Sequence, residues 1–427
     1  MSPNALTATT WYDQTGIAPP QTMALADLAP AYDTVIVGGG LAGLSLLWHL
    51  AEAGVSAALL DAGRIAGGAS GRNGGFCSAG WAAGEDQVIR LVGKGKAAVL
   101  EDAASGGVRW MRERMGRKGY EGADPKVGIL TVSLSGRPPA VMDAASRLLT
   151  GAALKAETTS PRYRYGFHSD GGVQFHPLNF MRALAGDALG AGQVIVEGAK
   201  IDRIDRQGSG LAVTSGRKTI QADRVVLATG GYGGPETGGL SRLLLPIRTY
   251  IGVTDPMPDI LSEHIPTRAG VDDTRRAGNY YRRLPDGRLL WGLGITAFGT
   301  LEVEAVRRMV AKDIGNIYPG LARDMHKAAV GIDTAWAGNM GYAHHFMPYV
   351  GEIEPGLFTI AGFGGHGMNT APAAAIALSK ALLGEPAALE PFSAIPRQAT
   401  FGPIGAVAAE ASYRWRQMND RLAEALS

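Results

Sequence analysis

DTVIVGGGLAGLSLLWHLAEAGVSAALLDAGRIAGGASGRNGGFC, residues 33–77, is the stretch that decides the fold. Residues 34–37 form a short β-branched run that is typical of a buried strand. Apolar residues then recur at helical spacing until Gly54, and a second apolar run covers residues 55–60. The stretch therefore predicts a strand, a helix and a second strand, which is the βαβ unit of a parallel sheet.

Three glycines at the first turn, Gly38, Gly40 and Gly43, have the spacing of a dinucleotide-binding fingerprint. Gly38 permits the tight turn, Gly40 leaves the backbone open to a pyrophosphate, and Gly43 lets helix and strand pack closely. Free amides at the helix N-terminus bind phosphate oxygens. Asp61, at the end of the second strand, can accept hydrogen bonds from both ribose hydroxyls. The pattern favours an ADP-ribose site over a βαβ unit that binds no nucleotide.

The composition of the whole chain limits the possible classes of protein. Its 427 residues, 46% of them hydrophobic, suffice for two domains or one large composite domain. A net charge of +2 argues against a nucleic-acid partner, and a single cysteine excludes an intrachain disulfide. No apolar run approaches the ~20 residues that span a bilayer. Residues 1–30 lack the basic and apolar regions of an export signal, so we expect a cytoplasmic protein without a membrane span.

A long glycine-rich loop, residues 62–84, follows the second strand. Such a run in a compact domain is more often functional than incidental. Arg72 and Asn73 lie between glycines, where their side chains can donate to a ligand close to the backbone. Because Phe76 and Trp81 are poor surface residues, we favour a loop that follows a cofactor over a floppy surface loop.

Hydrophobic periodicity and turn residues predict the remaining elements. Helices are expected over 86–118, 139–149, 178–189, 301–328 and 370–383. Strands are expected over 127–134, 193–197, 224–231 and 357–362, with two more between 198 and 224. Residues 165–176 are interpreted as a hairpin around two glycines, and residues 241–300 as an antiparallel sheet.

These elements predict an α/β fold in two parts. A discontinuous Rossmann-type cofactor-binding domain would comprise 31–90, 160–240 and 330–400. A substrate domain with a mixed or antiparallel sheet would comprise 91–159 and 241–329. Residues 1–30 would form an extended or partly disordered surface arm, and residues 401–427 a C-terminal helix.

Further motifs carry a resemblance to a known family. They are ASGRNGG at 69–75, FHP at 175–177, VLATG at 226–230, YRR at 281–283, GRLLWG at 287–292, AWAG at 335–338 and GFGGHG at 362–367. With the glycine fingerprint and Asp61, they resemble the D-amino-acid-oxidase-like superfamily of FAD-dependent amine and amino-acid oxidoreductases, closest to its gamma-glutamylputrescine oxidase-like branch. Two positions depart from the family pattern: Asp61 stands where glutamate is usual, and Phe76 where glutamine is common.

The resemblance implies FAD bound by separated segments, with the ADP half on the glycine fingerprint and the flavin near the 69–75 loop and the 364–368 turn. The implied FAD-binding residues are Gly38, Gly40, Leu41, Ala42, Gly43, Asp61, Ala62, Ser70, Gly71, Arg72, Asn73, Gly74, Gly75, Val196, Thr229, Gly230, Gly364, Gly365, His366, Gly367 and Met368. We expect non-covalent FAD, because Cys77 is better interpreted as a small buried hydrophobe than as an attachment point.

Candidate catalytic and substrate residues come from the second half of the chain and from the loop. The catalytic candidates are His366, Tyr281, His345 and Arg282, and the substrate-binding candidates are Phe76, Arg248, Tyr250, Trp291 and Trp336. For the aromatic residues, including Tyr280, packing in the core is the alternative. For the arginines, the alternative is a solvated surface position. No metal site is expected, because His344 and His345 are adjacent and diverge on a strand.

The implied reaction is oxidation of a C–N bond in an amine or amino-acid-type substrate to an imine, which hydrolyses to an aldehyde or keto acid. Electrons would pass to O2 with formation of H2O2, or, as the alternative, to a quinone or carrier protein. Residues 280–295 contain no lysine of the kind that activates oxygen in several oxidases of the superfamily. Two other classes remain open: an NAD-dependent dehydrogenase, and a flavin-bearing assembly or modification component without small-amine turnover.

Overall fold

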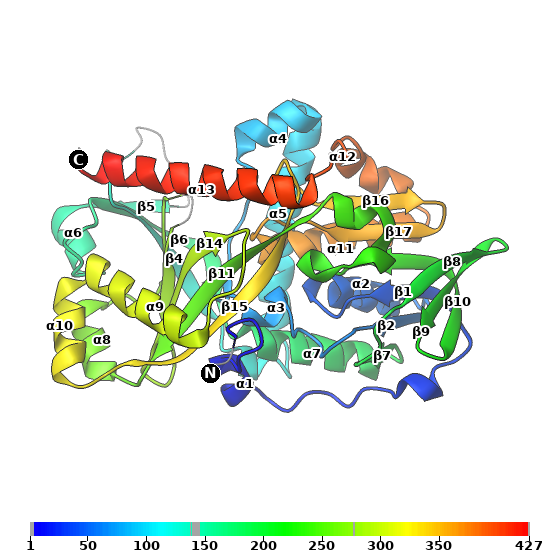
Figure 1. Cartoon of the computed structure of the whole chain (residues 1–427), viewed down its shortest axis with the longest axis horizontal. Coiled ribbons are helices and arrows are strands. Elements are labelled where there is room, and N and C mark those ends of the chain that lie inside the picture. The colour runs from blue at the N-terminus through cyan, green and yellow to red at the C-terminus, as the bar shows by residue number, and fades with distance from the viewer. Residues whose placement is uncertain (1–3, 137, 139–145, 276–277, 426–427) are drawn as a thin grey trace.

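Two β-sheets lie side by side, each covered by helices (Figure 1). The structure is a computed structural model that describes residues 4–136, 138, 146–275 and 278–425. In Figure 1 the first sheet lies on the right with its strands β1, β2, β10 and β17, and the second lies to its left. The chain crosses between the sheets several times, so each part is assembled from separated segments.

The first sheet is parallel at its centre. Its main path has the order β16-β17-β10-β1-β2-β7, and β8 and β9 extend it as a hairpin on β10. Strand β1 pairs in parallel with β2 and β10, while β16 pairs antiparallel to β17. The bounds are β1 Ala31–Val37, β2 Ala57–Leu60, β7 Val194–Val196, β8 Arg203–Gln207, β9 Gly210–Ser215, β10 Lys218–Leu227, β16 Tyr349–Glu354 and β17 Leu357–Ala361.

Helices α2 (Leu41–Glu52), α7 (Pro177–Gly190) and α11 (Gly367–Leu382) accompany this sheet. Residues Val35, Ile36, Leu59 and Leu60 are fully buried, as expected for parallel strands covered on both faces. Helix α2 is apolar over most of its circumference because it packs against both α7 and α11. The predicted βαβ unit is therefore the centre of this sheet.

The second sheet has the order β15-β11-β14-β13-β12-β4-β6-β3, with β5 on β6. Most of its pairs are antiparallel, but β12 runs parallel to β4. The bounds are β3 Phe76–Cys77, β4 Lys126–Ser133, β5 Ser146–Leu149, β6 Tyr165–Gln174, β11 Leu245–Thr254, β12 Gly270–Asp273, β13 Tyr280–Arg283, β14 Leu289–Thr296 and β15 Ile332–Tyr342.

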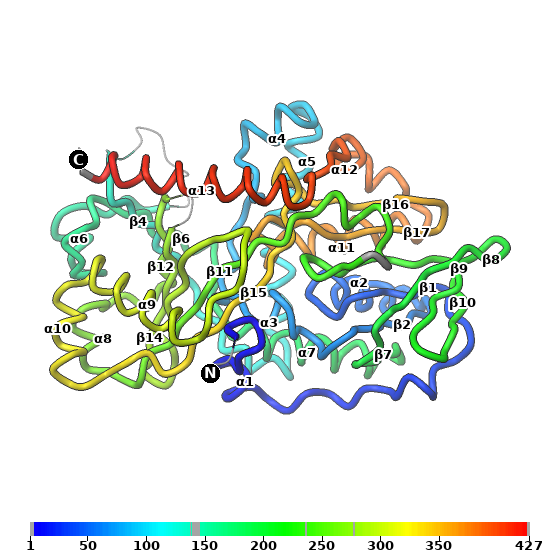
Figure 2. Tube along the Cα trace, in the orientation of Figure 1, coloured from blue at the N-terminus to red at the C-terminus, as the bar shows by residue number. Residues whose placement is uncertain are grey.

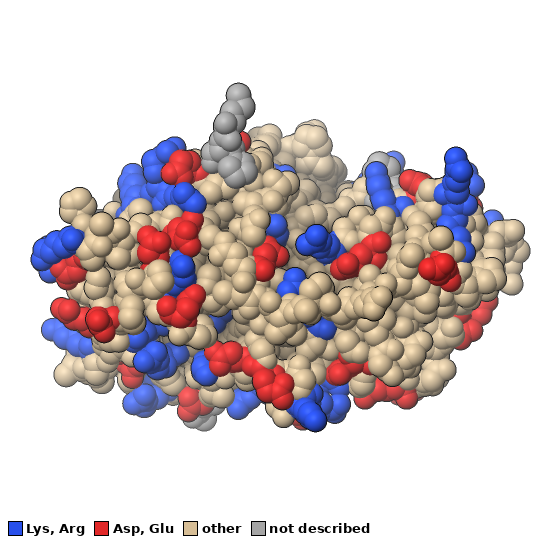
Figure 3. All heavy atoms as spheres, turned by 90° about the horizontal axis from the view of Figure 1, so that it is seen from below, with Lys and Arg blue, Asp and Glu red and all other residues tan. Residues whose placement is uncertain are grey.

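Further helices surround the second sheet and the junction of the two parts. They are α1 Trp11–Thr15, α3 Ala69–Arg72, α4 Glu85–Val92, α5 Lys94–Met115, α6 Gly151–Lys155, α8 Pro258–His264, α9 Val303–Ile317, α10 Pro319–Lys327, α12 Glu390–Ser393 and α13 Gly402–Ala425. Helix α13, red in Figure 1, crosses the molecule above the second sheet. No described helix is both long enough and apolar enough for a membrane span. On the face in Figure 3, basic and acidic side chains are interspersed.

Several predicted elements differ from the structure. The helix expected over 86–118 is two helices, α4 and α5, separated at Gly93, which has a φ of +79°. Of the helix expected over 139–149, the last four residues form strand β5, and residues 139–145 lie outside the described part. The hairpin expected over 165–176 is one strand, β6, because its glycine pair lies at an irregularity in the pairing with β4 and not in a turn.

The predicted domain boundaries cut across the two sheets. Strands β6 and β15 belong to the second sheet, although they lie within the ranges 160–240 and 330–400 predicted for the cofactor-binding domain. Helix α5, assigned to the substrate domain, packs against α11. The 241–300 segment contributes β11, β14, β13 and β12 as an antiparallel set, with α8 between β11 and β12 in sequence, and only the pairing of β12 with β4 is parallel.

The N-terminal arm is anchored by its aromatic residues. Figure 2 shows this segment, in blue, running beneath the first sheet to β1. Trp11 and Tyr12 are buried, and the ring of Tyr12 lies 4.9 Å from that of His176, centroid to centroid. Thr15 Oγ1 lies 3.1 Å from His176 Nε2, and His176 Nδ1 accepts the Asn179 amide at the start of α7. His176 therefore joins the arm to α7.

We expect His176 to make stability depend on pH. Burial lowers the pKa of His176 to about 3, and the positive charge of Arg282 acts in the same direction. Between pH 6.5 and 3 the unfolded chain binds a proton at this residue that the folded chain does not, so stability falls as pH decreases, by at most about 1.4 kcal/mol per pH unit. His176→Asn keeps a cap for α7 and should flatten this slope in urea unfolding at several pH values. Equal slopes for both proteins would contradict the assignment.

Candidate active site

The turn between β1 and α2 holds backbone segments in direct contact. Gly38 has a φ of +116°, and a Cβ there would lie 2.5 Å from the carbonyl oxygen of Ala228. A Cβ at Gly43 would lie 2.0 Å from the carbonyl oxygen of Gly38. A side chain at Gly38 would therefore push the turn away from the end of β10, and a side chain at Gly43 would push α2 away from β1. Glycine keeps the first-turn amides of α2 at the carboxyl edge of β1.

The N-terminus of α2 lies beside Ser70 of α3. Ser70 Oγ accepts a hydrogen bond from the Leu41 amide at 2.9 Å, and a Cβ at Gly40 would lie 3.1 Å from the same oxygen. The amides of Ala42 and Gly43, in the first turn, have no acceptor within the helix. Amides at a bare helix N-terminus, with the positive end of the helix dipole behind them, form a suitable cradle for a diphosphate.

Asp61 and Ala62 follow β2 at the same edge. Asp61 Oδ2 accepts the Gly39 amide at 2.6 Å, and Oδ1 accepts the Gly63 amide at 2.7 Å. The Asp61 amide donates to the carbonyl of Val196 at 2.9 Å, so the end of β7 borders the same region. The structure thus brings the fingerprint, Asp61 and Val196 to one edge of the sheet, and each carboxylate oxygen of Asp61 accepts one backbone amide there.

Thr229 and Gly230 lie at the end of β10, the other parallel neighbour of β1. Gly230 has a φ of +57°. The Thr229 hydroxyl is buried, and no described residue offers it a hydrogen-bond partner. A buried polar group without a protein partner is one that a bound polar ligand can satisfy. Thr229 therefore fits the predicted cofactor site.

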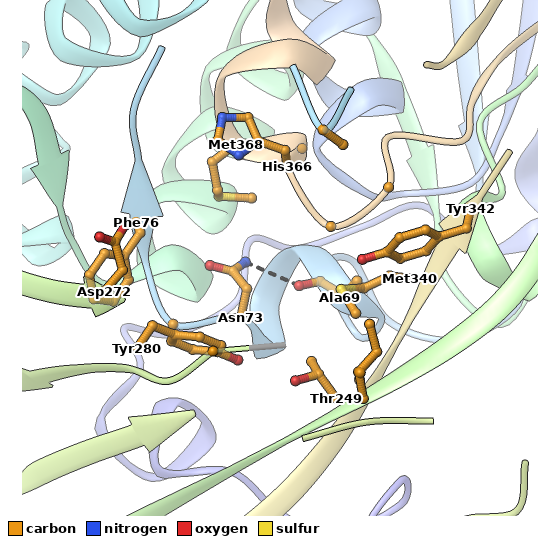
Figure 4. Close-up of a pocket in the computed structure, with 18 of the residues that line it drawn as sticks. Ala69, Asn73, Phe76, Thr249, Asp272, Tyr280, Met340, Tyr342, His366 and Met368 are labelled. Carbon is orange, nitrogen blue, oxygen red and sulfur yellow. Dashed lines mark hydrogen bonds between the residues drawn. The ribbon is translucent and has the colours of Figure 1, made fainter. Parts of the chain in front are cut away.

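Part of the predicted cofactor loop is the short helix α3, and hydrogen bonds of the Asn73 side chain hold it in place. Asn73 Nδ2 donates to the carbonyls of Ala69 and Ser70 at 3.1 and 2.7 Å, as Figure 4 shows for Ala69. Asn73 Oδ1 accepts the amide of Gly75 at 2.8 Å. Gly71 and Gly74 complete this segment. Asn73 thus holds the loop in shape, and its side-chain oxygen is already occupied by backbone.

Arg72 links the loop to two other parts of the chain. Its guanidinium donates to the carbonyls of Gly67 at 3.1 Å, Ala337 at 3.3 Å and Ala8 at 2.9 Å. The sequence predicts that these donors meet a ligand, whereas in the structure they donate to backbone carbonyls. Arg72 therefore fixes the loop against β15 and the N-terminal arm, while part of the residue lines the cavity described below.

A second glycine turn precedes α11. Gly364 and Gly365 have φ values of +60° and +85°, and His366 stands at the N-cap position before Gly367 and Met368. His366 Nε2 lies 3.2 Å from the carbonyl oxygen of Ala79. Burial lowers the pKa of His366, so the imidazole is neutral at neutral pH. The turn places a neutral imidazole and a helix N-terminus at one end of the cavity.

A cavity of about 440 Å³ separates this turn from the second sheet. Figure 4 shows Phe76 and Asp272 on one side, Met340 and Tyr342 on the opposite side, and His366 with Met368 facing Asn73 and Tyr280. The predicted residues among those lining it are Arg72, Asn73, Gly74, Phe76, Gly364, Gly365, His366, Gly367 and Met368. The loop and the second turn therefore line one cavity.

Tyr281 and Trp291 lie in the core and are absent from the cavity wall. Their rings stack at 4.4 Å with an interplanar angle of 9°. Tyr281 Oη contacts the hydroxyls of Tyr163 and Tyr318 at 3.0 and 2.7 Å, and Trp291 Nε1 donates to Asp313 at 2.8 Å. Because successive residues of a strand face opposite sides, Tyr280 lines the cavity and Tyr281 does not.

The other candidates also lie outside the cavity wall. His345 is buried, with Nε2 3.0 Å from the carbonyl oxygen of Pro396. Trp336 Nε1 donates to the carbonyl of Arg72 at 2.8 Å, which supports the loop from behind. Tyr250 is buried in β11, and Arg248 is half-buried in the same strand. These placements give Trp336 a positioning role and leave no cavity contact for the other three.

Sequence reasoning missed several lining residues. Asp272 and Tyr342 come from β12 and β15, and Tyr413 and Arg416 come from one side of α13. Two adjacent acidic residues, 272 and 273, end a strand that begins with Gly270 and Val271, and this pattern in the sequence could have indicated a functional site. No pattern in the sequence of α13 indicates that Tyr413 and Arg416 line the cavity, because their position depends on where this helix crosses the second sheet.

Cys77 and the potential metal ligands do not belong to the cavity wall. Burial raises the pKa of Cys77 to about 12, so its thiol stays protonated, in agreement with non-covalent cofactor binding. Within the described residues, Glu263, His264 and Asp324 could converge on an ion. That group lies at α8 and α10, away from the cavity wall.

Arg282 is a buried clamp. It donates to the carbonyls of Gly74 and Phe175, both at 2.8 Å, and to Tyr12 Oη at 3.3 Å. We expect Arg282→Met to lower the free energy of unfolding by about 3 kcal/mol or more, because two buried carbonyls lose charged donors. Urea unfolding of the flavin-loaded protein measures this loss. Arg217→Met, at an exposed arginine, is the control and should change stability by less than about 0.5 kcal/mol. Similar values for both variants would contradict the clamp.

The contact between Gly43 and Gly38 predicts a specific cofactor defect. Gly43→Ala places a methyl group against the Gly38 carbonyl and displaces the first turn of α2. We expect FAD affinity to fall at least about tenfold, since a loss of about 1.4 kcal/mol suffices. The flavin-to-protein absorbance ratio after dialysis measures it. Gly186→Ala, in α7 with nothing within 4 Å of its added Cβ, should retain wild-type flavin content. Full flavin retention by Gly43→Ala would contradict the role of this contact.

Comparisons with known proteins agree with this geometry. The probable oxidoreductase OrdL of Rhizobium meliloti (strain 1021) is 31% identical over 367 residues, 79% of this chain and 80% of its own. Gamma-glutamylputrescine oxidoreductase of Escherichia coli (strain K12) is 28% identical over 377 residues, 85% and 86% of the two chains. The crystal structure of glycine oxidase from Geobacillus kaustophilus has a TM-score of 0.68 at 20% identity, and the match covers 87% of this chain and all of that one. This likeness confirms the fold.

The family comparison identifies the cofactor. The family model DAO, described as FAD dependent oxidoreductase, matches residues 33–381. The residues present fit FAD: backbone without side chains at the glycines beside the α2 N-terminus, Asp61 at the end of the second strand, and the buried Thr229 hydroxyl, for which the described residues offer no hydrogen-bond partner. The chain belongs to the DAO family of FAD-dependent oxidoreductases.

Proposed function

We propose that this enzyme oxidises a C–N bond in an amine or amino-acid-type substrate and passes the electrons to O2. The substrate loses two electrons and two protons to become an imine, and water converts the imine to an aldehyde or keto acid. For a primary amine, one amine, one O2 and one water then give one aldehyde or keto acid, one ammonia and one H2O2.

The observation that carries the proposal is the cavity at the N-terminus of α11. Its wall combines the Gly364–Met368 segment, which we propose to lie beside the flavin, with aromatic rings and a carboxylate. Such a wall suits a compact nitrogen base. Support also comes from the E. coli relative, whose name describes an oxidoreductase of an amine, gamma-glutamylputrescine.

FAD, when bound, supplies the two-electron acceptor for this oxidation. The protein's own contribution begins with His366. The backbone of Ala79 and of Ser78 accepts hydrogen bonds from the His366 ring; if Nε2 is the donor, Nδ1 is left as an acceptor that can take a proton from a substrate ammonium. The lowered pKa of His366 keeps this nitrogen unprotonated at neutral pH. The N-terminus of α11 stabilises negative charge that develops beside it.

The second candidate function is that of a dehydrogenase that passes electrons to a quinone or carrier protein. The observation that favours it is the absence of lysine from residues 280–295, which include β13 and β14. Under the oxidase proposal, His366 or an arginine of the cavity provides the positive or proton-donating group near oxygen.

A substrate panel separates these functions. We expect anaerobic bleaching of the flavin by at least one member of a panel of polyamines, N-methyl amino acids, D- and L-amino acids and glutamyl amides. Glycerol 3-phosphate, a C–O donor, is the control and should leave the spectrum unchanged. In air, the active amine should yield stoichiometric H2O2. Bleaching without reoxidation by air, but with turnover on a quinone or dye, would establish the dehydrogenase. No bleaching by any amine would refute both.

A further inference from the structure

The charged side chains around the cavity differ in whether other protein groups bind them. The charged residues that line it are Arg72, Asp272, Asp273, Arg275 and Arg416. Arg72 donates to three carbonyls, as described above. Arg275 and Asp273 form a close pair, with Nη2 2.6 Å from Oδ2 and Nε 3.1 Å from both carboxylate oxygens. Asp273 also accepts the amide of Asn279 at 2.9 Å. These groups are therefore occupied within the protein.

Asp272 differs from its neighbour. Its Oδ1 is buried, and no described residue provides a hydrogen-bond partner for it. No arginine or lysine of the described chain forms an ion pair with Asp272, Arg416 included. A buried carboxylate without a cation or sufficient donors is costly unless a ligand completes it. Burial raises the pKa of Asp272 to about 6. A hydrogen bond from the Thr131 side chain lowers this pKa in part, and the negative charge of Asp273 raises it further.

Two aromatic rings flank Asp272. Tyr280 is its cross-strand partner on β13, so the two side chains share one face of the sheet. Phe76 lies over Gly270, two residues before Asp272, and its ring centroid lies 5.9 Å from that of Tyr280. Figure 4 shows Asp272 beside Phe76, with Tyr280 next to them. Aromatic rings beside a carboxylate form an environment that attracts an organic cation.

We propose that Asp272 binds a second positively charged nitrogen of the substrate, so that the preferred substrates are diamines or other amines with an additional ammonium group. One nitrogen belongs to the C–N bond that is oxidised, and the other forms an ion pair with Asp272 between Phe76 and Tyr280. Asp272 is then a specificity-determining residue. This inference rests on the proposed amine oxidation.

The test compares matched dications and monocations on the flavin-loaded enzyme. The substrates are 1,3-diaminopropane to 1,6-diaminohexane, each paired with the n-alkylamine of equal chain length. Anaerobic stopped-flow bleaching yields an apparent Kd and a limiting rate of flavin reduction for each. We expect at least one diamine to bind about 10- to 100-fold more tightly than its monoamine, the range for one buried charge pair.

Asp272→Asn preserves the shape of the side chain and removes its charge. We expect it to weaken binding of the favoured diamine about 10- to 100-fold, to change that of the monoamine less than about threefold, and to leave the limiting rate nearly unchanged. Asp102→Asn removes a carboxylate that is 80% exposed on α5 and should alter neither amine. Flavin content and circular dichroism verify that each variant is folded.

Three outcomes would overturn the inference while leaving amine oxidation intact. The first is equal affinity of the wild-type enzyme for diamines and monoamines at every chain length, which needs no variant. The second is an equal loss for both amines in Asp272→Asn. The third is a fall in the limiting rate with unchanged affinities, which would make Asp272 part of the chemical step. Absence of bleaching by every amine would instead refute the proposed function on which the inference rests.

Discussion

The close approach of Gly43 to the carbonyl of Gly38 is the contact on which the rest of the cofactor site depends. It sets α2 directly against β1, so that the helix N-terminus opens at the carboxyl edge of the parallel sheet. Asp61, Thr229 and Ser70 reach the same edge from β2, β10 and α3. Segments that are far apart in sequence thereby form one cradle, and its geometry follows from the absence of two Cβ atoms.

The second sheet has a different task, which is to present side chains to one cavity. Here the decisive factor is which face of a strand each residue occupies. Tyr280 reaches the cavity, while Tyr281 joins a buried stack with Trp291 and a hydroxyl chain with Tyr163 and Tyr318. Asp272 shares the face of Tyr280 because the two residues are paired across β12 and β13. A shift of one residue in this pairing would exchange the core and the cavity.

The sequence predicts the first sheet and its glycine turn better than it predicts the second sheet and the cavity. The strand, glycine turn, helix and acid of residues 33–61 are local signals, and the predicted α/β fold, FAD cofactor and DAO family are confirmed. Face and register in the second sheet depend on partners distant in sequence, so the aromatic candidates could not be sorted into wall and core. The glycine pair in β6 was misinterpreted for a related reason, because a strand irregularity and a turn use the same residues.

The anchoring of the N-terminal arm has a consequence for how the chain acquires its shape. Residues 5–12 leave the ribosome early, yet their partners are made much later: Trp11 Nε1 donates to Asp286, 275 residues away, and the Ala5 carbonyl accepts the amide of Ala337. Tyr12 and Ala8 also accept hydrogen bonds from Arg282 and Arg72, the two arginines that hold the 69–75 loop. Docking of this segment must therefore wait until residues 286 and 337 have been made, and such long-range closures are slow. The 69–75 loop can become rigid only after that late event.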